Sequence, residues 1–399
     1  MRFLFTIQPA LAHLHPIVPI ARALVESEQD VQFAAGARVC RVIENLGIPS
    51  YPAGIDWIGE DMAEVFPERD SLPLEKHVEF DVGEVFARRT PPPMIDDILE
   101  HSESWKPDLI VRDLWEFGGC IAAEVMDIPH AVIGLSGAAI APQELFDPLI
   151  AEPLTELRGR YNLPPDSHNA MLYRYLRLDL IPSSYRPPAL KPPSVTHTIR
   201  PVTEDRTMAT SLPEWIGGLP FEETVLVTLG TVNNQHPEIF RAILTGLASE
   251  RVNVIATIGT TLEPEMFGPQ PEQIRIEKYV PYSLLLDHID AVVMHGGFTS
   301  TMTALNKGLP IVFIPLALDH PVNAERFTEL GAGITLSRSE LTPEVVRNAV
   351  LAVLQEPMYR NAAQRIQQEM IAQPGPEYAA ELLIKLAKDK QPILSEFKQ

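Results

Sequence analysis

Cysteine is scarce in this 399-residue sequence, which has Cys40 and Cys120 and no others. Two cysteines cannot form a disulfide framework, and no group of cysteine and histidine has the spacing of zinc ligands. We therefore expect both to be buried apolar residues rather than reactive thiols. No apolar run is long enough to span a bilayer. Histidine and proline interrupt the apolar start early, which favours a buried strand over a signal peptide and predicts a cytoplasmic protein.

Basic residues are also few, since 32 Lys and Arg face 53 Asp and Glu, for a formal net charge of -21. Such a field repels phosphate backbones and anionic membrane surfaces, which excludes nucleic acid and membranes as partners. A nucleotide is still allowed, because the amides at one helix N-terminus can bind a diphosphate. The sequence lacks both GxGxxG and a P-loop, which weakens the dinucleotide and NTPase interpretations.

What the chain does contain is two successive sets of short β-rich runs that alternate with helical patterns. The length fits two domains, and 45% hydrophobic residues can form a sizeable core. Alternation of this kind predicts parallel sheets with crossover helices, hence two doubly wound domains. The first set of strands is RFLFTI, DVQFAA, DLIVRD and HAVIGL, and the second is TVLVTLG, NVIATIG, IRIEKYV, AVVMHGG and PIVFIP.

The 38 prolines are densest in Ile181–Pro201. Proline removes backbone donors and stiffens the chain, so this stretch is expected to be a connector rather than the interior of a sheet, with a domain boundary just after it, near Arg206–Trp215. Mixed charge and weak periodicity from about Trp57 to Pro93 favour loops or short helices over a site. Near the end, PGPEYAAELLIKLAKDK predicts a turn followed by an amphipathic helix.

The first chemical pair is His13 and Asp113. His13 follows the first predicted strand, and we expect the next helix to begin at Pro16. Asp113 ends the strand DLIVRD. Parallel strands share one carboxyl edge, so the two side chains can face each other there, and a histidine held by a carboxylate is a general base near neutral pH. The alternative is an ordinary polar loop histidine, and His15 is a competitor that we interpret as structural.

The second chemical element is the stretch AVVMHGGFTSTMTALNKG, in which a strand runs through His295 into a helix with hydroxyl residues in its first turn. Glycine lets a phosphate approach the backbone, and the helix N-terminus offers free amides, so this segment can hold a diphosphate and stabilise it as it leaves. The alternative is a glycine-rich turn that only packs a helix on a sheet.

Two further strand ends accompany this element. Gly230 and Thr231 end TVLVTLG, where a plain tight turn is the alternative. Asp319 and His320 follow IVFIP. A carboxylate beside a polar partner suits paired sugar hydroxyls, whereas the alternative is a solvated loop or a helix cap.

In order and spacing, these features resemble the inverting family 1 glycosyltransferases of the GT-B fold, with a closest likeness to bacterial enzymes that decorate antibiotics and other natural products. The likeness spans the chain and is weak in Trp57–Pro93 and Pro142–Asn169. It implies an α/β fold with two Rossmann-like, doubly wound parallel-sheet domains facing a cleft. The implied parts are an acceptor-binding domain (1–205), a linker (206–217), a nucleotide-sugar-binding domain (218–375) and a C-terminal helix that returns to the first domain (376–399).

The resemblance also implies residue roles, with His13 as the catalytic base and Asp113 as its partner. His295 and the amides after it match the diphosphate site, and Val280 matches the position that contacts the nucleobase of the donor. Asp319 with His320 matches an Asp-Gln pair that reads donor hydroxyls. The donor-binding set implied is Gly230, Thr231, Val280, His295, Gly296, Gly297, Thr299, Ser300, Thr301, Asp319 and His320.

Several positions depart from the family pattern. Ala12 stands where glycine is common, Thr299 and Ser300 where Gly-Thr is common, and His320 where glutamine is usual. At Thr303, many UDP-sugar members carry a glutamate that binds the ribose hydroxyls. Because deoxyribose lacks one of those hydroxyls, Thr303 favours a dTDP-sugar donor, with a deoxysugar as the hypothesis.

The predicted activity is metal-independent, inverting transfer of that sugar to a hydroxyl of a small natural-product acceptor, with no cofactor besides the sugar nucleotide. The alternatives are a GT-B nucleotide-sugar epimerase and a non-catalytic nucleotide-sugar-binding helper. The sequence leaves the acceptor, the sugar and the oligomeric state open, with a homodimer as one possibility. The residues predicted to line an acceptor pocket, for which core packing is the alternative, are Trp57, Phe80, Phe86, Trp115, Phe117 and Leu135.

Overall fold

The structure is a computed structural model that describes residues 1–58, 62–73, 76–135, 137–140, 143–202, 212–230, 235–280, 282–317 and 319–395. The chain divides into two compact units. Unit 1 comprises Met1–Ile181, Arg186–Glu204 and Gln373–Gln399, and unit 2 comprises Pro182–Tyr185 and Asp205–Ala372. Of the predicted linker, residues 206–211 lie outside the described residues.

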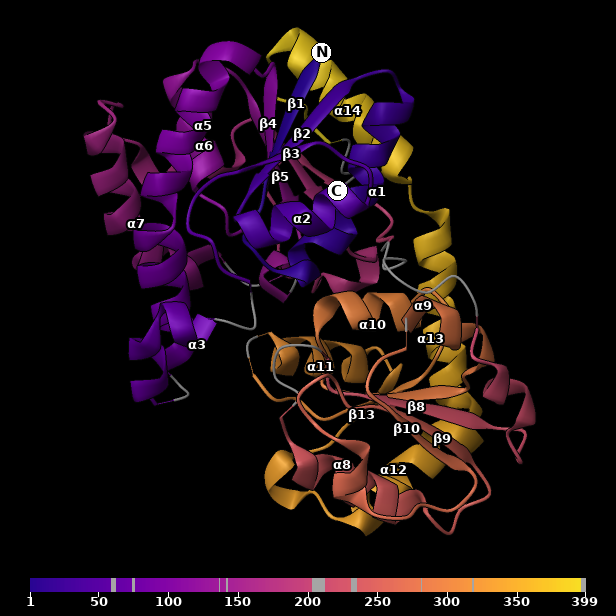
Figure 1. Cartoon of the computed structure of the whole chain (residues 1–399). Coiled ribbons are helices and arrows are strands. Elements are labelled where there is room, and N and C mark those ends of the chain that lie inside the picture. Colours follow the sequence, from indigo (N-terminus) through magenta and orange to yellow (C-terminus); the bar gives the residue numbers. More distant parts are fainter. Residues whose placement is uncertain are drawn as a thin grey trace. The chain divides into compact units, whose positions relative to one another are not determined.

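Unit 1 is built on a seven-stranded parallel sheet of order β3-β2-β1-β4-β5-β6-β7 (Figure 1). The chain passes from β1 outward to β3 and then returns to the other side of β1 with β4, which is the strand order of a doubly wound fold. Its strands are β1 (Arg2–Thr6), β2 (Asp30–Ala35), β3 (Ser50–Pro52), β4 (Leu109–Asp113), β5 (His130–Gly134), β6 (Leu176–Asp179) and β7 (Thr196–Thr198).

The described helices of unit 1 include the C-terminal helix, α14, which packs against the first helix, α1. The α-helices are α1 (Leu11–Glu26), α2 (Ala37–Asn45), α3 (Met62–Val65), α4 (His77–Glu79), α5 (Pro91–Trp105), α6 (Gly118–Val125), α7 (Gln143–Arg160) and α14 (Pro376–Asp389). The 3-10 helices are η2 (Pro67–Ser71), η5 (Gly137–Ala139) and η6 (Ser167–Tyr173), and η4 (Phe80–Arg89) is a π-helix.

Unit 2 repeats the same winding with six parallel strands in the order β10-β9-β8-β11-β12-β13. Its strands are β8 (Thr224–Thr228), β9 (Asn253–Thr257), β10 (Ile274–Glu277), β11 (Ala291–Met294), β12 (Ile311–Phe313) and β13 (Gly333–Thr335). Its α-helices are α8 (Pro237–Leu247), α9 (Tyr282–Leu285), α10 (Phe298–Leu305), α11 (His320–Glu329), α12 (Pro343–Gln355) and α13 (Pro357–Ala372). Its described 3-10 helices are η7 (Ser183–Tyr185), η8 (Glu214–Gly218), η9 (Pro264–Phe267), η10 (Leu286–His288) and η11 (Arg338–Glu340).

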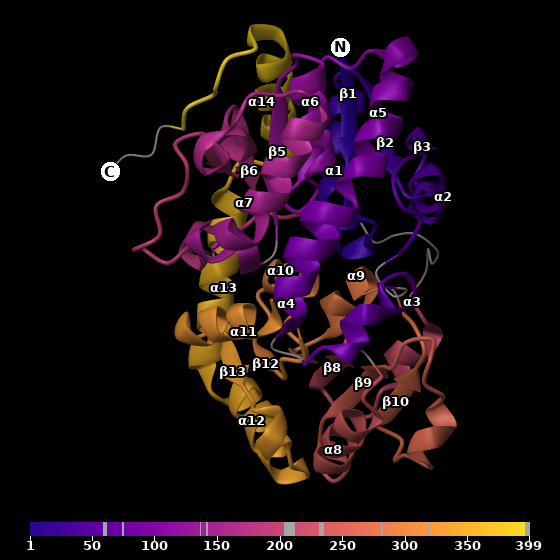
Figure 2. The same ribbon diagram turned by 90° about the vertical axis from the view of Figure 1, so that its left-hand side faces the viewer.

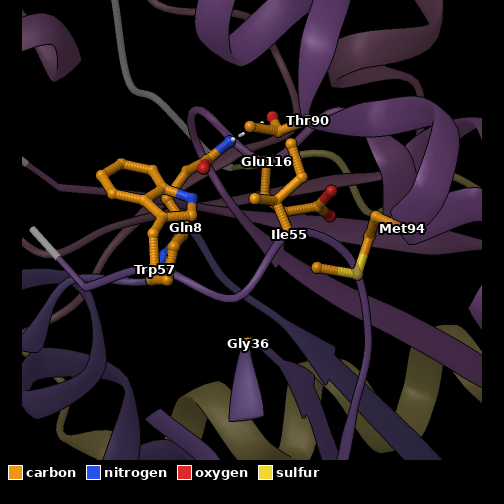
Figure 3. A pocket seen from close by; sticks show the side chains of 8 residues that line it. Gln8, Gly36, Ile55, Trp57, Thr90, Met94 and Glu116 are labelled. Carbon is orange, nitrogen blue, oxygen red and sulfur yellow. Dashed lines mark hydrogen bonds between the residues drawn. The ribbon is translucent and has the colours of Figure 1, made fainter. Parts of the chain in front are cut away.

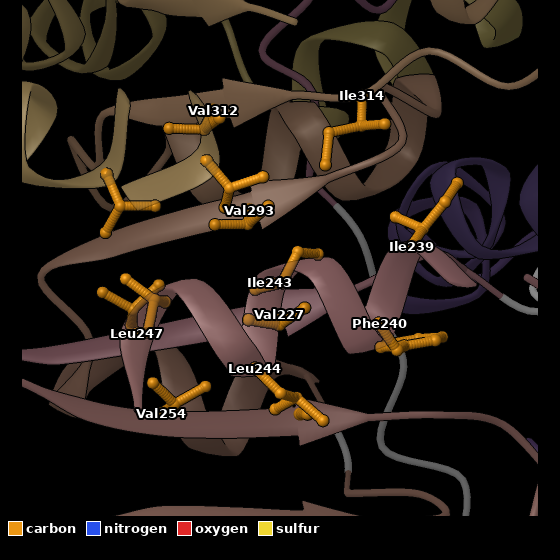
Figure 4. Close-up of a cluster of buried hydrophobic side chains, with 14 of the residues drawn as sticks. Val227, Ile239, Phe240, Ile243, Leu244, Leu247, Val254, Val293, Val312 and Ile314 are labelled. Atoms are coloured by element: carbon orange, nitrogen blue, oxygen red, sulfur yellow. The ribbon is translucent and has the colours of Figure 1, made fainter. Parts of the chain in front are cut away.

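The core of unit 2 shows why these segments fold as they do. Helix α8 carries apolar residues at helical spacing, and they lie against valines of the central strands (Figure 4). On the same face of the sheet, α12 packs beside α8 (Figure 2). Burying each large apolar side chain contributes about 2 kcal/mol relative to exposure. The side chains of α8 in this core are Ile239, Phe240, Ile243, Leu244 and Leu247.

Most predicted elements are confirmed, including the two doubly wound sheets, but the start of the first helix is wrong. Helix α1 begins at Leu11 rather than Pro16, so His13 lies in its first turn and not in a loop. The extended backbone of Ala10 ends the turn after β1, and Pro16 and Pro19 are accommodated inside the helix. Proline disfavours a helix interior because it supplies no amide, so the sequence pattern placed the start too late.

The proline-rich stretch also differs in part from the prediction of a connector. Strand β7 lies inside Ile181–Pro201 and pairs in parallel with β6 at the edge of the sheet, so Thr196–Thr198 are not part of a connector, although the stretch stays out of the sheet interior as predicted. Proline is compatible with an edge strand, whose outer side needs no ladder of amides. The described parts of Trp57–Pro93 form short helices as predicted, and Pro91, which follows the π-helix, starts α5, where an amide would have no partner.

Candidate active site

The site in unit 1 lies where its sheet reverses its winding. Strands β1 and β4 are neighbours in parallel register, with Thr6 opposite Arg112, so the segments after both strands emerge at the same carboxyl edge. In doubly wound folds, this switch point is where ligands bind. The segment after β1 leads to His13, and β4 ends in Asp113.

His13 and Asp113 meet as the sequence predicts, with 3.1 Å between His13 Nδ1 and Asp113 Oδ2. The carboxylate is fully buried, whereas the His13 side chain remains 18% exposed. Asp113 Oδ2 also accepts a hydrogen bond from the amide of Gln8 at 2.6 Å, and Oδ1 accepts from the amides of Trp115 at 2.7 Å and Glu116 at 3.1 Å. The carboxylate is therefore held from both sides.

These contacts decide the protonation of the pair. Burial by itself raises the pKa of Asp113, but His13 and the amides of Gln8 and Trp115 hold that pKa below its ordinary value. An ionised carboxylate can only accept, so Nδ1 of His13 carries the proton of their hydrogen bond. In neutral His13, Nε2 then presents the lone pair, which is the tautomer that a general base needs.

Two charged residues that sequence reasoning missed hold the segment after β4. Arg112 is buried, and its guanidinium donates to the carbonyls of Asp113 at 3.1 Å, Leu114 at 3.2 Å and Leu172 at 2.8 Å. The signal was available, because an arginine inside the apolar run DLIVRD needs buried acceptors.

Glu116 binds the other end of the same segment. Its carboxylate accepts from the amides of Gly118 at 2.6 Å and Gly119 at 2.8 Å, which begin α6, and from the Thr6 hydroxyl at 2.5 Å. Burial raises the pKa of Glu116, against the hydrogen bonds of Thr6 and Gly119, which lower it. Glu116 thereby ties β1 to the N-terminus of α6 beside the His13–Asp113 pair.

A small cavity is lined by Gln8, whose backbone amide binds Asp113, and by Glu116 (Figure 3). Gln8 reaches across it, donating to the carbonyl of Trp115 at 2.8 Å and lying 3.4 Å from the Thr90 hydroxyl. Trp57 and Glu116 contribute further walls. The full lining is Gln8, Pro9, Gly36, Ile55, Trp57, Thr90, Met94 and Glu116. The cavity therefore combines apolar walls with amide, hydroxyl and carboxyl groups.

The predicted acceptor residues differ in their surroundings. Trp57 lines the cavity. The ring centre of Trp115 lies 6.2 Å from that of Phe86 and 6.4 Å from that of Phe117. Phe80 is only partly buried on the π-helix, where Arg89 lies over its ring. Two of the candidates, Phe117 and Leu135, are almost completely buried, each with an exposed fraction of 2%.

In unit 2, the segments after β8 and β11 meet around the ring of His295. A Cβ on Gly230 would lie 2.7 Å from His295 Cε1, and a Cβ on Gly297 would lie 2.4 Å from Nε2, so only glycine fits beside the ring at both positions. Gly230 (φ 79°) and Gly296 (φ 90°) also adopt left-handed backbone that favours glycine. The strands are adjacent in the sheet, which brings the predicted glycines and histidine together.

The His295 side chain is buried and electrically neutral in this structure. Burial, aided by His320, lowers the pKa of His295 to about 3, against Asp319 and the carbonyl of Thr228, which raise it. Its Nδ1 is buried and, among the described residues, has no hydrogen-bond partner of ordinary geometry. An unsatisfied buried nitrogen beside a helix N-terminus is a position that an anionic ligand would relieve.

The hydroxyl residues of α10 are arranged unequally. Thr299 and Ser300 are partly exposed in the first turn. Thr301 is completely buried, and its hydroxyl donates to the carbonyl of Gly297 at 2.9 Å. The Thr303 hydroxyl likewise donates to the carbonyl of Thr299 at 2.8 Å. The first-turn amides, together with Thr299 and Ser300, are thus the groups of this helix best placed for a diphosphate.

Asp319 and His320 begin α11, with Asp319 as its N-terminal cap residue. The Nδ1 of His320 accepts a hydrogen bond from the amide of Ala317 at 3.1 Å, so its proton is on Nε2. Burial lowers the pKa of His320 to about 4. The ring of His320 packs edge-on against that of His295, with 4.5 Å between the ring centres. Asp319 and His320 therefore offer an acceptor and a neutral donor side by side.

Two predicted donor residues are less defined. Val280 is buried after β10, two strands away from β8. Thr231 lies outside the described residues. Over the part of the chain that the structure describes, no three His, Cys, Asp or Glu side chains form a metal-binding group, and no helix is long and apolar enough to cross a membrane.

Two Rossmann-like units, one carrying a His-Asp pair and the other a His-Gly-Gly loop ahead of a helix N-terminus, define the class as a glycosyltransferase of the GT-B fold. The family comparison agrees. The model of the erythromycin biosynthesis protein CIII-like N-terminal domain matches residues 23–230, and that of its C-terminal domain matches residues 241–386. The chain therefore belongs to the erythromycin biosynthesis protein CIII-like family.

Individual relatives support this assignment over nearly the full length. The chain is 28% identical to 4'-demethylrebeccamycin synthase of Lentzea aerocolonigenes, over 96% of this chain and 98% of the relative. It is also 28% identical to 3-alpha-mycarosylerythronolide B desosaminyl transferase of Saccharopolyspora erythraea, over 98% and 99%. The crystal structure of the glycosyltransferase VinC in complex with dTDP matches with a TM-score of 0.79 and 26% identity, over 97% and 100%.

Proposed function

We propose that this glycosyltransferase transfers a deoxysugar, with inversion, from a dTDP carrier to a hydroxyl of a small natural-product aglycone, with His13 as the general base. The observation that carries the proposal is the 3.1 Å contact between His13 Nδ1 and the buried, amide-bound carboxylate of Asp113. It places the proton of neutral His13 on Nδ1, so Nε2 is the nitrogen that accepts a proton from the acceptor hydroxyl.

In the proposed reaction, the acceptor oxygen attacks the anomeric carbon while its proton passes to Nε2 of His13. The bond from the anomeric carbon to the phosphate oxygen breaks on the opposite face, and its electron pair leaves with the diphosphate. Asp113 stabilises the imidazolium that forms. The amides that begin α10, with the ring of His295, bind the departing diphosphate, so the step needs no metal ion.

The choice of donor rests on Thr303 and on a relative. The Thr303 hydroxyl already donates its proton to the carbonyl of Thr299, and this position has no carboxylate to accept bonds from two ribose hydroxyls. A deoxyribose has one hydroxyl fewer than a ribose, so it needs fewer hydrogen-bond acceptors at this position. VinC, similar to this chain throughout its length, has been crystallised with dTDP. The natural-product acceptor is supported by the relatives named for such products.

The first experiment is the thermal stabilisation of the purified protein by dTDP and by UDP, with EDTA present. A clear rise in Tm with dTDP supports the donor assignment. A rise with UDP alone overturns the inference from Thr303 but leaves the transferase activity intact. No rise with either nucleotide overturns the proposed donor site.

The second experiment tests the base. The acceptors offered are aglycone alcohols, including 3-alpha-mycarosylerythronolide B. His13→Ala should abolish sugar transfer to them while it retains the affinity for dTDP. His15→Ala, two residues further along the same helix, is the matched control and should keep transfer within about threefold of the wild type. If His13→Ala keeps transfer within about threefold and His15→Ala abolishes it, His13 is not the base.

A further inference from the structure

Tyr185 is a fully buried aromatic residue with no role in the mechanism above. It ends the short helix η7 and belongs to unit 2, although the strands before and after it in sequence, β6 and β7, belong to unit 1. Its ring stacks on Phe327 with 4.9 Å between the ring centres. Arg326 donates to the carbonyls of Tyr185 at 2.9 Å and Ser184 at 2.5 Å. The ring is therefore fixed in position, and its hydroxyl bonds one partner among the described residues.

That partner is Asn323, which is completely buried in α11. The Tyr185 hydroxyl forms a hydrogen bond with Asn323 Oδ1. On its other side, Asn323 Nδ2 donates to the carbonyl of Gly296 at 2.7 Å and to Oδ2 of Asp319 at 3.1 Å. One amide thus connects the loop that follows His295 to the carboxylate that begins α11. Neither segment is close to the other in sequence.

The carbonyl of Gly296 and the carboxylate of Asp319 select the orientation of this amide, and the hydroxyl of Tyr185 supports it. A carbonyl and a carboxylate can only accept, so Asn323 must turn its NH2 group towards Gly296 and Asp319. Its Oδ1 then needs a donor on the opposite side, and the hydroxyl of Tyr185 supplies it. Burial raises the pKa of Tyr185 well above its ordinary value, so the hydroxyl keeps its proton. Without the hydroxyl, the buried Oδ1 of Asn323 would lose this donor.

We propose that Tyr185 and Asn323 are positioning residues for the donor sugar, which hold the Asp319 carboxylate and the Gly296 loop in the geometry that recognises sugar hydroxyls. This inference rests on the proposed function, in which Asp319 reads the hydroxyls of a dTDP-sugar. Asn323 fixes one oxygen of the Asp319 carboxylate, and the neutral ring of His320 follows directly at the start of α11. The connector peptide between two strands of unit 1 therefore takes part in donor recognition in unit 2.

Tyr185→Phe removes the hydroxyl and keeps the stacked ring. We expect the affinity for dTDP-glucose, a probe that presents a full set of ring hydroxyls, to fall about tenfold, because a buried acceptor loses its donor. The affinity for dTDP alone should stay within about twofold, because the amides of α10 do not depend on Asp319. In steady state, the KM for the sugar donor should rise while kcat changes little, which a general loss of stability would not produce.

Tyr359→Phe is the matched control, since Tyr359 is a partly buried tyrosine of unit 2 on α13, and it should bind both ligands like the wild type. Asn323→Asp provides a second arm, because it replaces the NH2 group by an oxygen that faces Asp319 and Gly296. It should weaken the affinity for dTDP-glucose more than tenfold and keep the affinity for dTDP. The retained dTDP affinity also shows that the site is folded.

The outcomes separate the two levels of the argument. If the wild type binds neither dTDP nor dTDP-glucose, the proposed function is overturned and this inference falls with it. If the wild type binds both and the Tyr185→Phe and Asn323→Asp variants lose affinity for both equally, or for neither, the positioning role is overturned and the proposed function stands. A selective loss of dTDP-glucose in either variant supports the inference.

Discussion

Asp113→Asn is the most informative single change, because the side chain keeps its shape and changes only its hydrogen bonding. In the structure, Oδ1 faces the amides of Trp115 and Glu116, while Oδ2 faces the amide of Gln8 and His13 Nδ1. Whichever oxygen becomes NH2, it meets at least one backbone donor. The better orientation sacrifices the Gln8 hydrogen bond and forces His13 to accept at Nδ1, which moves the histidine proton to Nε2.

Two magnitudes follow from this geometry. A buried amide left unsatisfied costs about 1–3 kcal/mol, and relief from burying a charge offsets part of that, so the free energy of unfolding should fall by about 2 kcal/mol. Losing the correct tautomer cost about 10⁴-fold in kcat for the equivalent change in a serine protease triad, so we expect a loss of about 10³–10⁴-fold here. Binding of dTDP should be unchanged.

The assays are urea unfolding followed by circular dichroism, and single-turnover transfer to the best aglycone alcohol found. Asp108→Asn is the matched control, since its carboxylate also accepts a backbone hydrogen bond, from Arg2 at 2.8 Å, at the opposite end of the same strands. That variant should keep its transfer rate. If Asp113→Asn keeps transfer within about tenfold, Asp113 does not set the tautomer of a catalytic His13.

The same pair predicts part of the acid sensitivity of the fold. The pKa of Asp113 in the folded protein lies below its ordinary value, so its ionised form stabilises the fold above about pH 4. This stabilisation is lost as the pH falls through the lowered pKa. The Asp113→Asn variant should therefore show a flatter decrease in the free energy of unfolding below about pH 4 than the wild type.

Three further results are expected. Burial lowers the pKa of His130 and His295 to about 3 and that of His320 to about 4, so these side chains stay neutral at pH values where the unfolded chain binds protons. The free energy of unfolding should therefore fall by about 1 kcal/mol per histidine between about pH 6.5 and 5.5. Urea unfolding that gives the same free energy throughout this range would contradict their neutral burial. Gly230→Ala should weaken dTDP binding by at least about tenfold in calorimetry, because its Cβ would meet the His295 ring. Gly268 also has a positive φ but has nothing within 4 Å of an added Cβ, so Gly268→Ala should bind dTDP normally; equal affinities of the two variants would refute the cradle around His295. Transfer in EDTA should match transfer with added Mg²⁺ within about twofold, and a rate that depends on the metal would contradict the role of His295 and the α10 amides.

The two doubly wound sheets and the place of each chemical element were predictable from the sequence. Apolar runs that alternate with helical patterns favour parallel sheets covered by helices, and polar residues that directly follow a strand lie at the carboxyl edge of its sheet. His13, Asp113, His295 and Asp319 were predictable on this ground, because their positions depend on local order along the chain. Arg112 could also have been found, since an arginine in a buried strand signals a demand for acceptors.

Features that depend on contacts between distant segments became visible only in the folded structure. Whether α1 begins before Pro16 depends on how β1 and β4 hold the turn, and the sequence shows only that proline disfavours a helix interior. The direction of the Thr301 hydroxyl and the neutrality of His295 depend on burial by neighbours that are far away in sequence. The link from Tyr185 through Asn323 to Asp319 depends on folding a connector of one unit into the other, and no periodicity or spacing encodes that contact.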